Sequence, residues 1–346
     1  MSSFLSREIA SQPAEVGGFI DRHAAAMERL GHTLPHCSYV VIAARGSSDH
    51  AATFARYVLG GVARLPVASA APSLHTLYKT PPRFEGALVV GISQSGQSPD
   101  VVSVVEEARA QGRPTIGFTN DLGSPLARMS DHVFDLCLTP EHAIAATKTY
   151  TTQLAAVALL GAALAKDQAR LEELRRLPEA MAKVLAGAAE PCAAAAASLR
   201  DEQSFLTIAR GINLCTAEEL ALKLRELLRV TTQGFSAADF RHGSIALIVP
   251  GVPVLLIAPR GIASDDMSAL ASELTARGAK LAVIAEQPAA MPGMALPIPL
   301  AATVPEWLSP ISAVLPGQLL ALELVLAKGL DPDRPRGLPE KVVKTV

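Results

Sequence analysis

Residues 87–119 read ALVVGISQSGQSPDVVSVVEEARAQGRPTIGFT: an apolar run, a polar loop, a segment with helical spacing that ends at a glycine, and a second apolar run. Short apolar or β-branched runs bounded by turn residues are typical of buried strands. A strand, a loop, a helix and a further strand in this order predict a βαβ unit of a parallel sheet. We therefore predict an α/β fold.

The same alternation extends through the first half of the chain. We predict strands at residues 38–44, 65–70, 87–92, 115–119 and 132–138. Apolar positions recur at helical spacing over residues 148–164, and the Ala-rich region over about residues 170–199 is suited to a linker helix. We expect a parallel sheet flanked by helices, with a domain boundary near residues 185–200.

A second copy of the unit follows later in the chain. Residues 252–285, VPVLLIAPRGIASDDMSALASELTARGAKLAVIA, repeat the strand, loop, helix and strand at nearly the same offset, and the segment IAARGSS is echoed by TIARGIN. Equivalent positions in the two copies are Arg45 and Arg210, the helix starts Ser98 and Ser264, and the helix caps Gly112 and Gly278. The sequence thus predicts one α/β unit duplicated in tandem, of which the first copy alone has the serine-rich loop.

Composition limits the class of protein and of partner. At 346 residues the chain is longer than one hydrophobic core usually organises, and 49% hydrophobic against 18% charged residues is typical of globular domains. A net charge of −2 without a dense Lys/Arg block predicts neither nucleic acid nor an anionic membrane as partner. The start of the chain lacks the pattern of a signal peptide, and the Ala-rich stretches are too polar or too short to span a bilayer, so we expect a cytoplasmic protein.

The cysteines point to packing and not to chemistry. They form no CxxC pair and lie in apolar surroundings, which predicts buried free thiols and implies no disulfide, metal or cofactor. The four are Cys37, Cys137, Cys192 and Cys215.

The loop SQSGQS follows a predicted parallel strand, at the sheet edge where ligands of open α/β folds bind. Ser98 suits the N-cap of the next helix, Pro99 its first position and Asp100 its first turn. The helix N-terminus favours an anion, Gly96 allows close approach of the backbone, and further donors come from Ser93, Gln94 and Ser95. The loop therefore predicts a phosphate site without a lysine, although a merely polar loop would have the same composition.

A companion loop, RGSSDH, places Ser47 and Ser48 after the predicted strand at 38–44. Two hydroxyl-bearing loops at one sheet edge strengthen the prediction of a phosphate site. Neither loop matches GxGxxG or GxxxxGK[ST], so dinucleotide and nucleoside triphosphate sites are poorly supported.

Six segments in the same order resemble the tandem sugar isomerase (SIS) domains, specifically the isomerase half of glucosamine-6-phosphate synthase and the stand-alone glucosamine-6-phosphate deaminases of the second type. The segments are RGSSDHAA, GISQSGQSPD, AATKTYTTQ, EELALKLRELL, DFRHGSIALI and DRPRGL. The resemblance covers the chain from about residue 35 to its end. It implies two flavodoxin-like SIS domains, residues 1–190 with an N-terminal helical segment and residues 191–330, followed by an active-site tail at 331–346.

The resemblance also assigns residues to a phosphorylated amino sugar. It implies that the sugar phosphate is surrounded by Ser47, Ser93, Gln94, Ser95 and Ser98. Ser48 and the backbone at Ile144 and Ala145 contact the sugar in the same reading. The family builds its active site in a homodimer, with a histidine loop supplied by the neighbouring subunit.

The catalytic groups are expected in the second copy. Lys223 and Glu226 are three residues apart and share a helix face. An exposed Lys/Glu pair on a surface helix is the simpler interpretation of this spacing, but the pair matches the K-x-x-E motif of the family. Glu226 would then carry the proton between two carbons, Lys223 would stabilise charge at the sugar oxygens, and His242 would open the sugar ring. A lone histidine is otherwise more often structural.

The family also uses a lysine of the C-terminal tail as a Schiff base with the ketose. Lys341 is the matching residue, but Pro339 and Glu340 depart by one position from the usual spacing, so Lys344 is the alternative. Three other histidines lie near the loops without a spacing that predicts a role. They are His50, His75 and His142.

These assignments predict conversion of glucosamine 6-phosphate to fructose 6-phosphate and ammonia. The chain begins MSSF and reaches its first predicted SIS strand within about forty residues, so we expect no glutaminase domain and favour deamination. The alternatives are a deglycase or isomerase of another amino-sugar phosphate, a synthase subunit supplied with ammonia by a separate partner, and a non-catalytic phosphosugar sensor.

Overall fold

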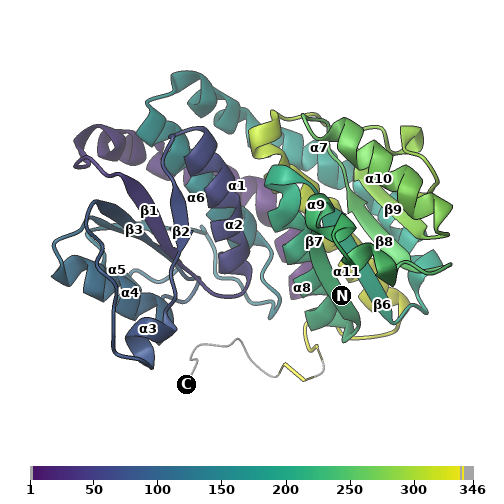
Figure 1. Ribbon diagram of the computed structural model, residues 1–346, viewed down its shortest axis with the longest axis horizontal. Coiled ribbons are helices and arrows are strands. Elements are labelled where there is room, and N and C mark those ends of the chain that lie inside the picture. The colour runs from purple at the N-terminus through teal and green to yellow at the C-terminus, as the bar shows by residue number, and fades with distance from the viewer. Residues whose placement is uncertain (1–2, 336, 339–346) are drawn as a thin grey trace. The chain divides into compact units, whose positions relative to one another are not determined.

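A computed structural model describes residues 3–335, 337 and 338, and these form two compact units, each around one parallel sheet (Figure 1). The first unit holds residues 14–141 and 148–175. The second unit holds residues 3–13 and 142–147 together with the described residues from 176 onwards. The predicted α/β class is confirmed.

The first sheet has the order β2-β1-β3-β4-β5. Its strands are β1 (Tyr39–Ala43), β2 (Val67–Ser69), β3 (Ala87–Ile92), β4 (Thr115–Thr119) and β5 (His132–Asp135). All five predicted strands are present, but β5 ends three residues early. The chain leaves the sheet there because the backbone N–H of Leu138 donates to the carboxylate of Glu15 on helix α1 (Phe4–Thr33), 2.6 Å away, and not to β4.

The second sheet has the order β10-β9-β8-β6-β7. Its strands are β6 (Ser204–Ala209), β7 (Thr231–Ser236), β8 (Pro253–Ile257), β9 (Lys280–Ala285) and β10 (Met294–Pro299). Counted from its own first strand, this order is the same as in the first sheet. The predicted duplication is therefore confirmed, and 2-1-3-4-5 is the flavodoxin-like order, with a switch point between the first and third strands.

Helices cover both faces of each sheet (Figure 1). Besides α1, those that begin before the second sheet are α2 (Ser47–Gly61), α3 (Ser73–Thr76), α4 (Pro99–Ala110), α5 (Pro125–Met129), α6 (Lys148–Ala165) and α7 (Gln168–Leu199). The later ones are α8 (Leu214–Leu228), α9 (Ala237–Arg241), α10 (Ser264–Ala276) and α11 (Ser309–Ala327), with 3-10 turns η1 (Gly211–Asn213), η2 (Ser244–Leu247), η3 (Pro288–Ala290) and η4 (Glu306–Leu308). Valine-rich faces of α4 pack on β1 and β3 in the first core, and α10 packs on β8 and β9 in the second.

The repeat holds in detail at the helix ends, with one shift. Gly112 and Gly278 follow their helices with φ of 67° and 83°, the left-handed region that glycine reaches without a Cβ penalty. Ser98 is the N-cap of α4, whereas Ser264 is already the first residue of α10 and Ala263 precedes it. The shift arises because Ser264 Oγ donates to the Gly261 carbonyl and accepts from the Gly261 N–H, which closes a turn before the helix.

One segment in the described part of the chain, Glu306–Ala327, is long and apolar enough to cross a membrane by length and composition, and 78% of its most apolar window is buried in the protein. That degree of burial is expected of a core helix. The four cysteines are free thiols, three of them buried, and burial raises the pKa of Cys137 and of Cys192 to about 12.

Gly31 near the end of α1 generates a test of packing in the first unit. A Cβ at this position would lie against the backbone carbonyl of Ala163 on α6, which cannot move aside as a side-chain tip could. We expect Gly31→Ala to lower the free energy of unfolding by about 1–3 kcal/mol, the usual cost of overpacking. The measurement is urea denaturation of the whole chain.

Gly60→Ala on α2 is the matched control. Its Cβ would meet one backbone atom at 3.9 Å, an ordinary contact, so the better helix propensity of alanine should raise stability by about 0.5–1 kcal/mol. Equal effects of the two substitutions would contradict a close approach of α1 and α6.

Candidate functional site

The two hydroxyl-bearing loops converge at the switch point of the first sheet, as predicted. The loop at Arg45 follows β1, and the loop at residues 93–98 follows its neighbour β3. Arg45 Nε and Nη2 donate to Asp100 Oδ2 at 3.0 and 2.8 Å, and Thr76 Oγ1 donates to Asp100 Oδ1 at 3.0 Å. This ion pair was not predicted, although both residues belong to the quoted motifs RGSSDH and GISQSGQSPD.

The serine loop is held in shape by its own hydroxyls. The N–H of Gly96 donates to Ser93 Oγ at 3.2 Å, and the N–H of Gln97 donates to Ser95 Oγ at 3.3 Å. A hydroxyl that accepts from the backbone still has its own proton to donate. Gly96 has φ of +62°, and a Cβ there would collide with the hydroxyl of Ser124, so glycine is required. The arrangement can offer two O–H donors to an anion.

Ser98 lies at the N-cap of α4 as predicted, but its hydroxyl makes no capping hydrogen bond. The N–H groups of Val101 and Val102 donate to its carbonyl instead, at 3.1 and 3.0 Å. Fewer helix N–H groups are therefore open to an anion than the sequence suggested. Its hydroxyl is left as a further donor or acceptor for a ligand.

The companion loop begins helix α2 with Ser47 and Ser48. Ser48 is buried, and its Oγ accepts a hydrogen bond from Nε2 of Gln153 on α6 at 3.0 Å. Gln153 was not singled out from the sequence, where it closes the segment AATKTYTTQ. No local spacing links residues 105 positions apart.

The segment with Ile144 and Ala145 is fixed by a buried carboxylate. Glu8 on α1, 5% exposed, accepts from the backbone N–H groups of His142 and Ala143, the second at 3.1 Å. These contacts hold the backbone immediately before Ile144. The role of Glu8 was not predicted, because a glutamate near the chain start has no local sequence signal of burial.

Lys223 and Glu226 share one face of α8, as the spacing predicts, but they are not an exposed surface pair. The Lys223 side chain is 2% exposed, and its Nζ lies 2.6 Å from Glu226 Oε2 and 3.4 Å from Glu219 Oε1. Glu219 is fully buried, whereas Glu226 is 25% exposed. A buried ammonium requires such partners, and the lysine–carboxylate cluster leaves Glu226 as the carboxylate that a ligand can reach. The i, i+4 spacing of Glu219 could have identified it.

His242 follows α9 and is exposed, and its backbone N–H donates to the Asp239 carbonyl at 3.0 Å. Glu226 precedes β7 and His242 lies beyond the far end of that strand. The six residues of this strand span about 20 Å, so β7 separates the two residues along the path of the chain. Lys341 and Lys344 lie outside the described residues.

The second unit contains an equivalent ion pair, but a side chain of the protein itself binds to its loop. Arg210 Nε lies 3.1 Å from Asp266 Oδ2, the counterpart of the pair formed by Arg45. Where the first unit has its serine loop, the N–H of Ile262 donates to both oxygens of Glu306 at 3.1 Å. A carboxylate of the chain therefore occupies the position where the first unit offers donors.

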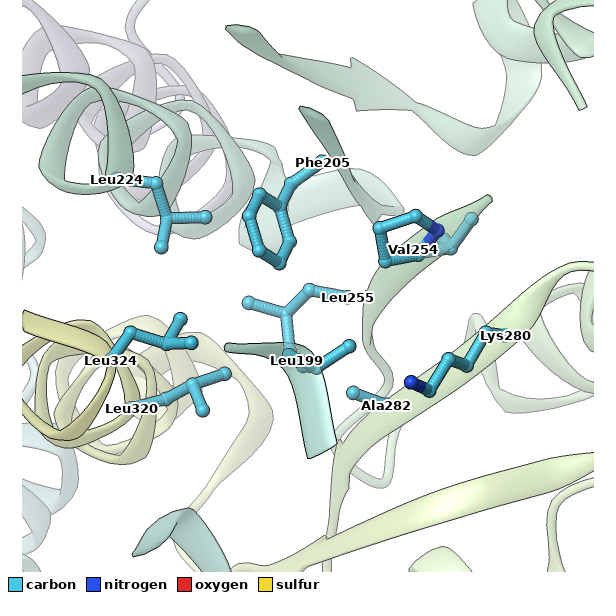
Figure 2. Close-up of a pocket in the computed structure, with 10 residues that line it drawn as sticks. Leu199, Phe205, Leu224, Val254, Leu255, Lys280, Ala282, Leu320 and Leu324 are labelled. Atoms are coloured by element: carbon cyan, nitrogen blue, oxygen red, sulfur yellow. The ribbon is translucent and has the colours of Figure 1, made fainter. Parts of the chain in front are cut away.

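The cavity in Figure 2 is a packing gap in the second unit and not a ligand pocket. It lies among aliphatic side chains of β8, α8 and α11, including Leu255, Leu224 and Leu320, and has a volume of about 10 Å³. That is at most the space of one water, and the lining offers it few polar partners. Lys280 also belongs to the lining, and its ammonium donates to the Ser198 carbonyl at 2.8 Å.

Comparison with known proteins adds the family context. The SIS domain family matches residues 34–163 and 198–327. Glutamine–fructose-6-phosphate aminotransferase (isomerizing) of Pyrococcus horikoshii is 34% identical over 345 residues, which are 98% of this chain and 57% of that enzyme. The chain thus spans little more than half the length of this relative.

Two solved structures cover the chain almost completely. A Silicibacter pomeroyi DSS-3 protein provisionally described as a phosphosugar isomerase superimposes with a TM-score of 0.86 at 31% identity, over 96% of this chain and all of that one. The C-terminal domain of glucosamine-fructose-6-phosphate aminotransferase from Francisella tularensis gives 0.88 at 25% identity, over 97% and 99%.

Ser98 generates a prediction that separates capping from ligand binding. Because its hydroxyl makes no cap hydrogen bond, Ser98→Ala should change the free energy of unfolding by less than about 0.5 kcal/mol. It should weaken the binding of inorganic phosphate by about tenfold, since a hydrogen bond to a charged group is lost. Thermal stabilisation by increasing phosphate concentration measures that affinity.

Ser124→Ala is the control, because Ser124 does cap its helix by accepting from the N–H of Ala127 at 3.2 Å. Its loss should cost about 1 kcal/mol of stability. Unchanged phosphate affinity in Ser98→Ala would remove this hydroxyl from the anion site.

Proposed function

The chain belongs to the SIS domain family, and we propose that it is an amino-sugar phosphate isomerase that converts glucosamine 6-phosphate to fructose 6-phosphate and ammonia. The 34% identity to an isomerizing aminotransferase supports the isomerase part of the proposal. The likeness to a protein described as a phosphosugar isomerase supports the same class of substrate. The release of ammonia is the more specific part of the proposal and rests on the proton transfers that the side chains can perform.

The observation that carries the proposal is the buried lysine–carboxylate cluster on α8. Glu226 alone in the cluster has substantial exposure, and the Lys223 ammonium lies 2.6 Å from its carboxylate. A carboxylate beside a fixed cation is suited to moving a proton on a substrate while negative charge develops on a neighbouring oxygen. An exposed ion pair would be mobile and screened, and would offer neither property.

The proposed reaction needs proton transfers and water but no external oxidant. His242 moves a proton between the ring oxygen and the C1 hydroxyl, which opens the sugar to an aldehyde. Glu226 removes the proton from C2 and returns it to C1 through an enolamine, while Lys223 stabilises the charge on the C1 oxygen. C1 is thereby reduced as C2 is oxidised to an imine. Water then adds at C2 and ammonia leaves.

The proposal assigns phosphate recognition to the first unit and proton transfer to the second. Ser47, Ser93, Gln94, Ser95 and Ser98 would bind the phosphate, and Ser48 with the backbone at Ile144 and Ala145 would contact the sugar. In the C-terminal tail, Lys341, or Lys344 in its place, would form a Schiff base with the ketose.

A synthase subunit is the second candidate. The Pyrococcus horikoshii relative is an aminotransferase, and it aligns with 98% of this chain. The same side chains can run the isomerisation from fructose 6-phosphate if ammonia is supplied. Incubation with fructose 6-phosphate and an ammonium salt, compared with glucosamine 6-phosphate alone, shows which direction the isolated chain catalyses.

The proposal predicts a specific effect of Glu226→Gln, which keeps size and helix propensity but removes the base. Binding of glucosamine 6-phosphate should persist, turnover should fall by about 100-fold or more, and exchange of the C2 hydrogen with solvent deuterium should stop. Ammonia release and proton NMR measure the two rates.

The matched control is Glu179→Gln on α7. Glu179 forms a truly exposed pair with Lys183, 2.7 Å apart and with both side chains more than half exposed. Its loss should leave turnover unchanged. Exchange at the wild-type rate in Glu226→Gln would reject Glu226 as the proton carrier, and binding without any turnover in the wild-type protein would favour a sensor.

A homodimer with shared active sites is also part of the proposal, supported by the separation of Glu226 and His242 along β7. If His242 acts from the neighbouring subunit, Glu226→Gln and His242→Ala chains should complement each other. In random mixed dimers one of two sites regains both groups, which predicts about a quarter of wild-type turnover. Each variant alone should remain inactive, and an active monomer in sedimentation would contradict the arrangement.

A further inference from the structure

We propose that Gln153 is a positioning residue that sets the direction of the Ser48 hydroxyl, so that Ser48 donates its proton to a sugar oxygen. The inference rests on the proposed function for the identity of the ligand. It adds a residue of α6 that does not touch the ligand but determines what Ser48 can recognise.

The contact itself is buried and well defined. Gln153 is 1% exposed, and its Nε2 donates to Ser48 Oγ at 3.0 Å. Within the described part of the chain, the Ser48 side chain makes this one hydrogen bond. Ser48 retains 8% exposure at the start of α2, so its hydroxyl remains within reach of a ligand.

The direction of the hydrogen bond determines the chemistry. Because Oγ accepts from an amide N–H, its own proton must be donated elsewhere. A hydroxyl held in this way recognises an acceptor, such as a hydroxyl or carbonyl oxygen of a sugar. Oγ keeps one more lone pair, but its proton needs an acceptor, which an ammonium group does not offer. We therefore assign the Ser48 proton to a sugar oxygen and not to the amino group.

Gln153 lowers the stability of the folded protein, which indicates that it is present for a functional reason. Its Oε1 is buried and finds no hydrogen-bond partner among the residues that the structure describes. A buried amide oxygen without a donor is unfavourable, and an apolar side chain of similar size would fill the same space without that cost. Neighbouring positions of α6, Leu154 to Val157, are apolar and fully buried. A glutamine at this position is explained by the hydroxyl it orients.

The test is a double-mutant cycle with Ser48→Ala, Gln153→Met and both together, measured as KM and kcat for glucosamine 6-phosphate. Methionine keeps the length of the side chain and its helix propensity. Each single variant should raise KM by about tenfold, the effect of one hydrogen bond. The double variant should be no worse than Ser48→Ala alone, because Gln153 acts only through Ser48.

Further variants separate positioning from packing. Gln153→Glu offers only acceptors, so it takes the Ser48 proton for itself and should raise KM more than Gln153→Met does. Thr152→Val removes a buried hydroxyl from the same helix, which bonds to the Lys148 carbonyl, and should leave KM unchanged. Inhibition by inorganic phosphate should be equal in wild type and Gln153→Met, since Ser48 is assigned to the sugar.

A double variant whose KM rises by the product of the single effects, about 100-fold, would overturn the inference. So would Gln153→Met with wild-type KM, or with phosphate affinity lost in parallel. If Gln153→Met does not fold, Gln153→Glu in the Ser48→Ala background carries the same comparison. Failure of the proposed function would look different: the wild-type protein would bind fructose 6-phosphate in calorimetry but would not turn over substrate. In that case the double-mutant cycle of Ser48 and Gln153 is measured as the Kd for fructose 6-phosphate.

Discussion

An arginine–aspartate ion pair at equivalent positions of the two units fixes how the loops at the carboxyl edge of the sheet meet. Parallel strands bring all such loops to one edge but do not set the distance between one loop and the next helix. Arg45 and Asp100 set that distance in the first unit, and Arg210 and Asp266 do so in the second. Arg45 is about half exposed, so the pair contributes little net stability. Its effect is geometric, because it joins the strand β1 loop to the first turn of α4.

The parts of the fold that depend on local pattern could be predicted from the sequence. Apolar runs of the right length identify the strands of the first sheet, and the glycines after α4 and α10 identify helix ends because their left-handed backbone favours that residue. The tandem repeat, read from motif offsets, gives the topology of the second sheet. The early end of β5 escaped prediction, because it depends on Glu15, more than a hundred residues away.

The candidate site shows the same division. Local sequence signals predict two parts of the site: the helix start at Ser98 and Pro99, and the shared helix face of Lys223 and Glu226. The i, i+4 spacing also marks Glu219 as a partner of Lys223, but the burial of this pair comes from the packing of α8, which no spacing reveals. The Ser48–Gln153 contact and the carboxylate of Glu8 join elements far apart in sequence, and such pairs become visible only when the chain is folded.

Glu306 distinguishes the second copy of the loop from the first. Its carboxylate is attached to the same chain as the N–H of Ile262, so the contact forms within one molecule and does not depend on the concentration of a dissolved anion. The second loop thus behaves as a receptor saturated by its own covalently attached ligand. An anion in solution would have to displace that carboxylate, so this loop is closed to a ligand, whereas the loop at residues 93–98 keeps its hydroxyl donors available.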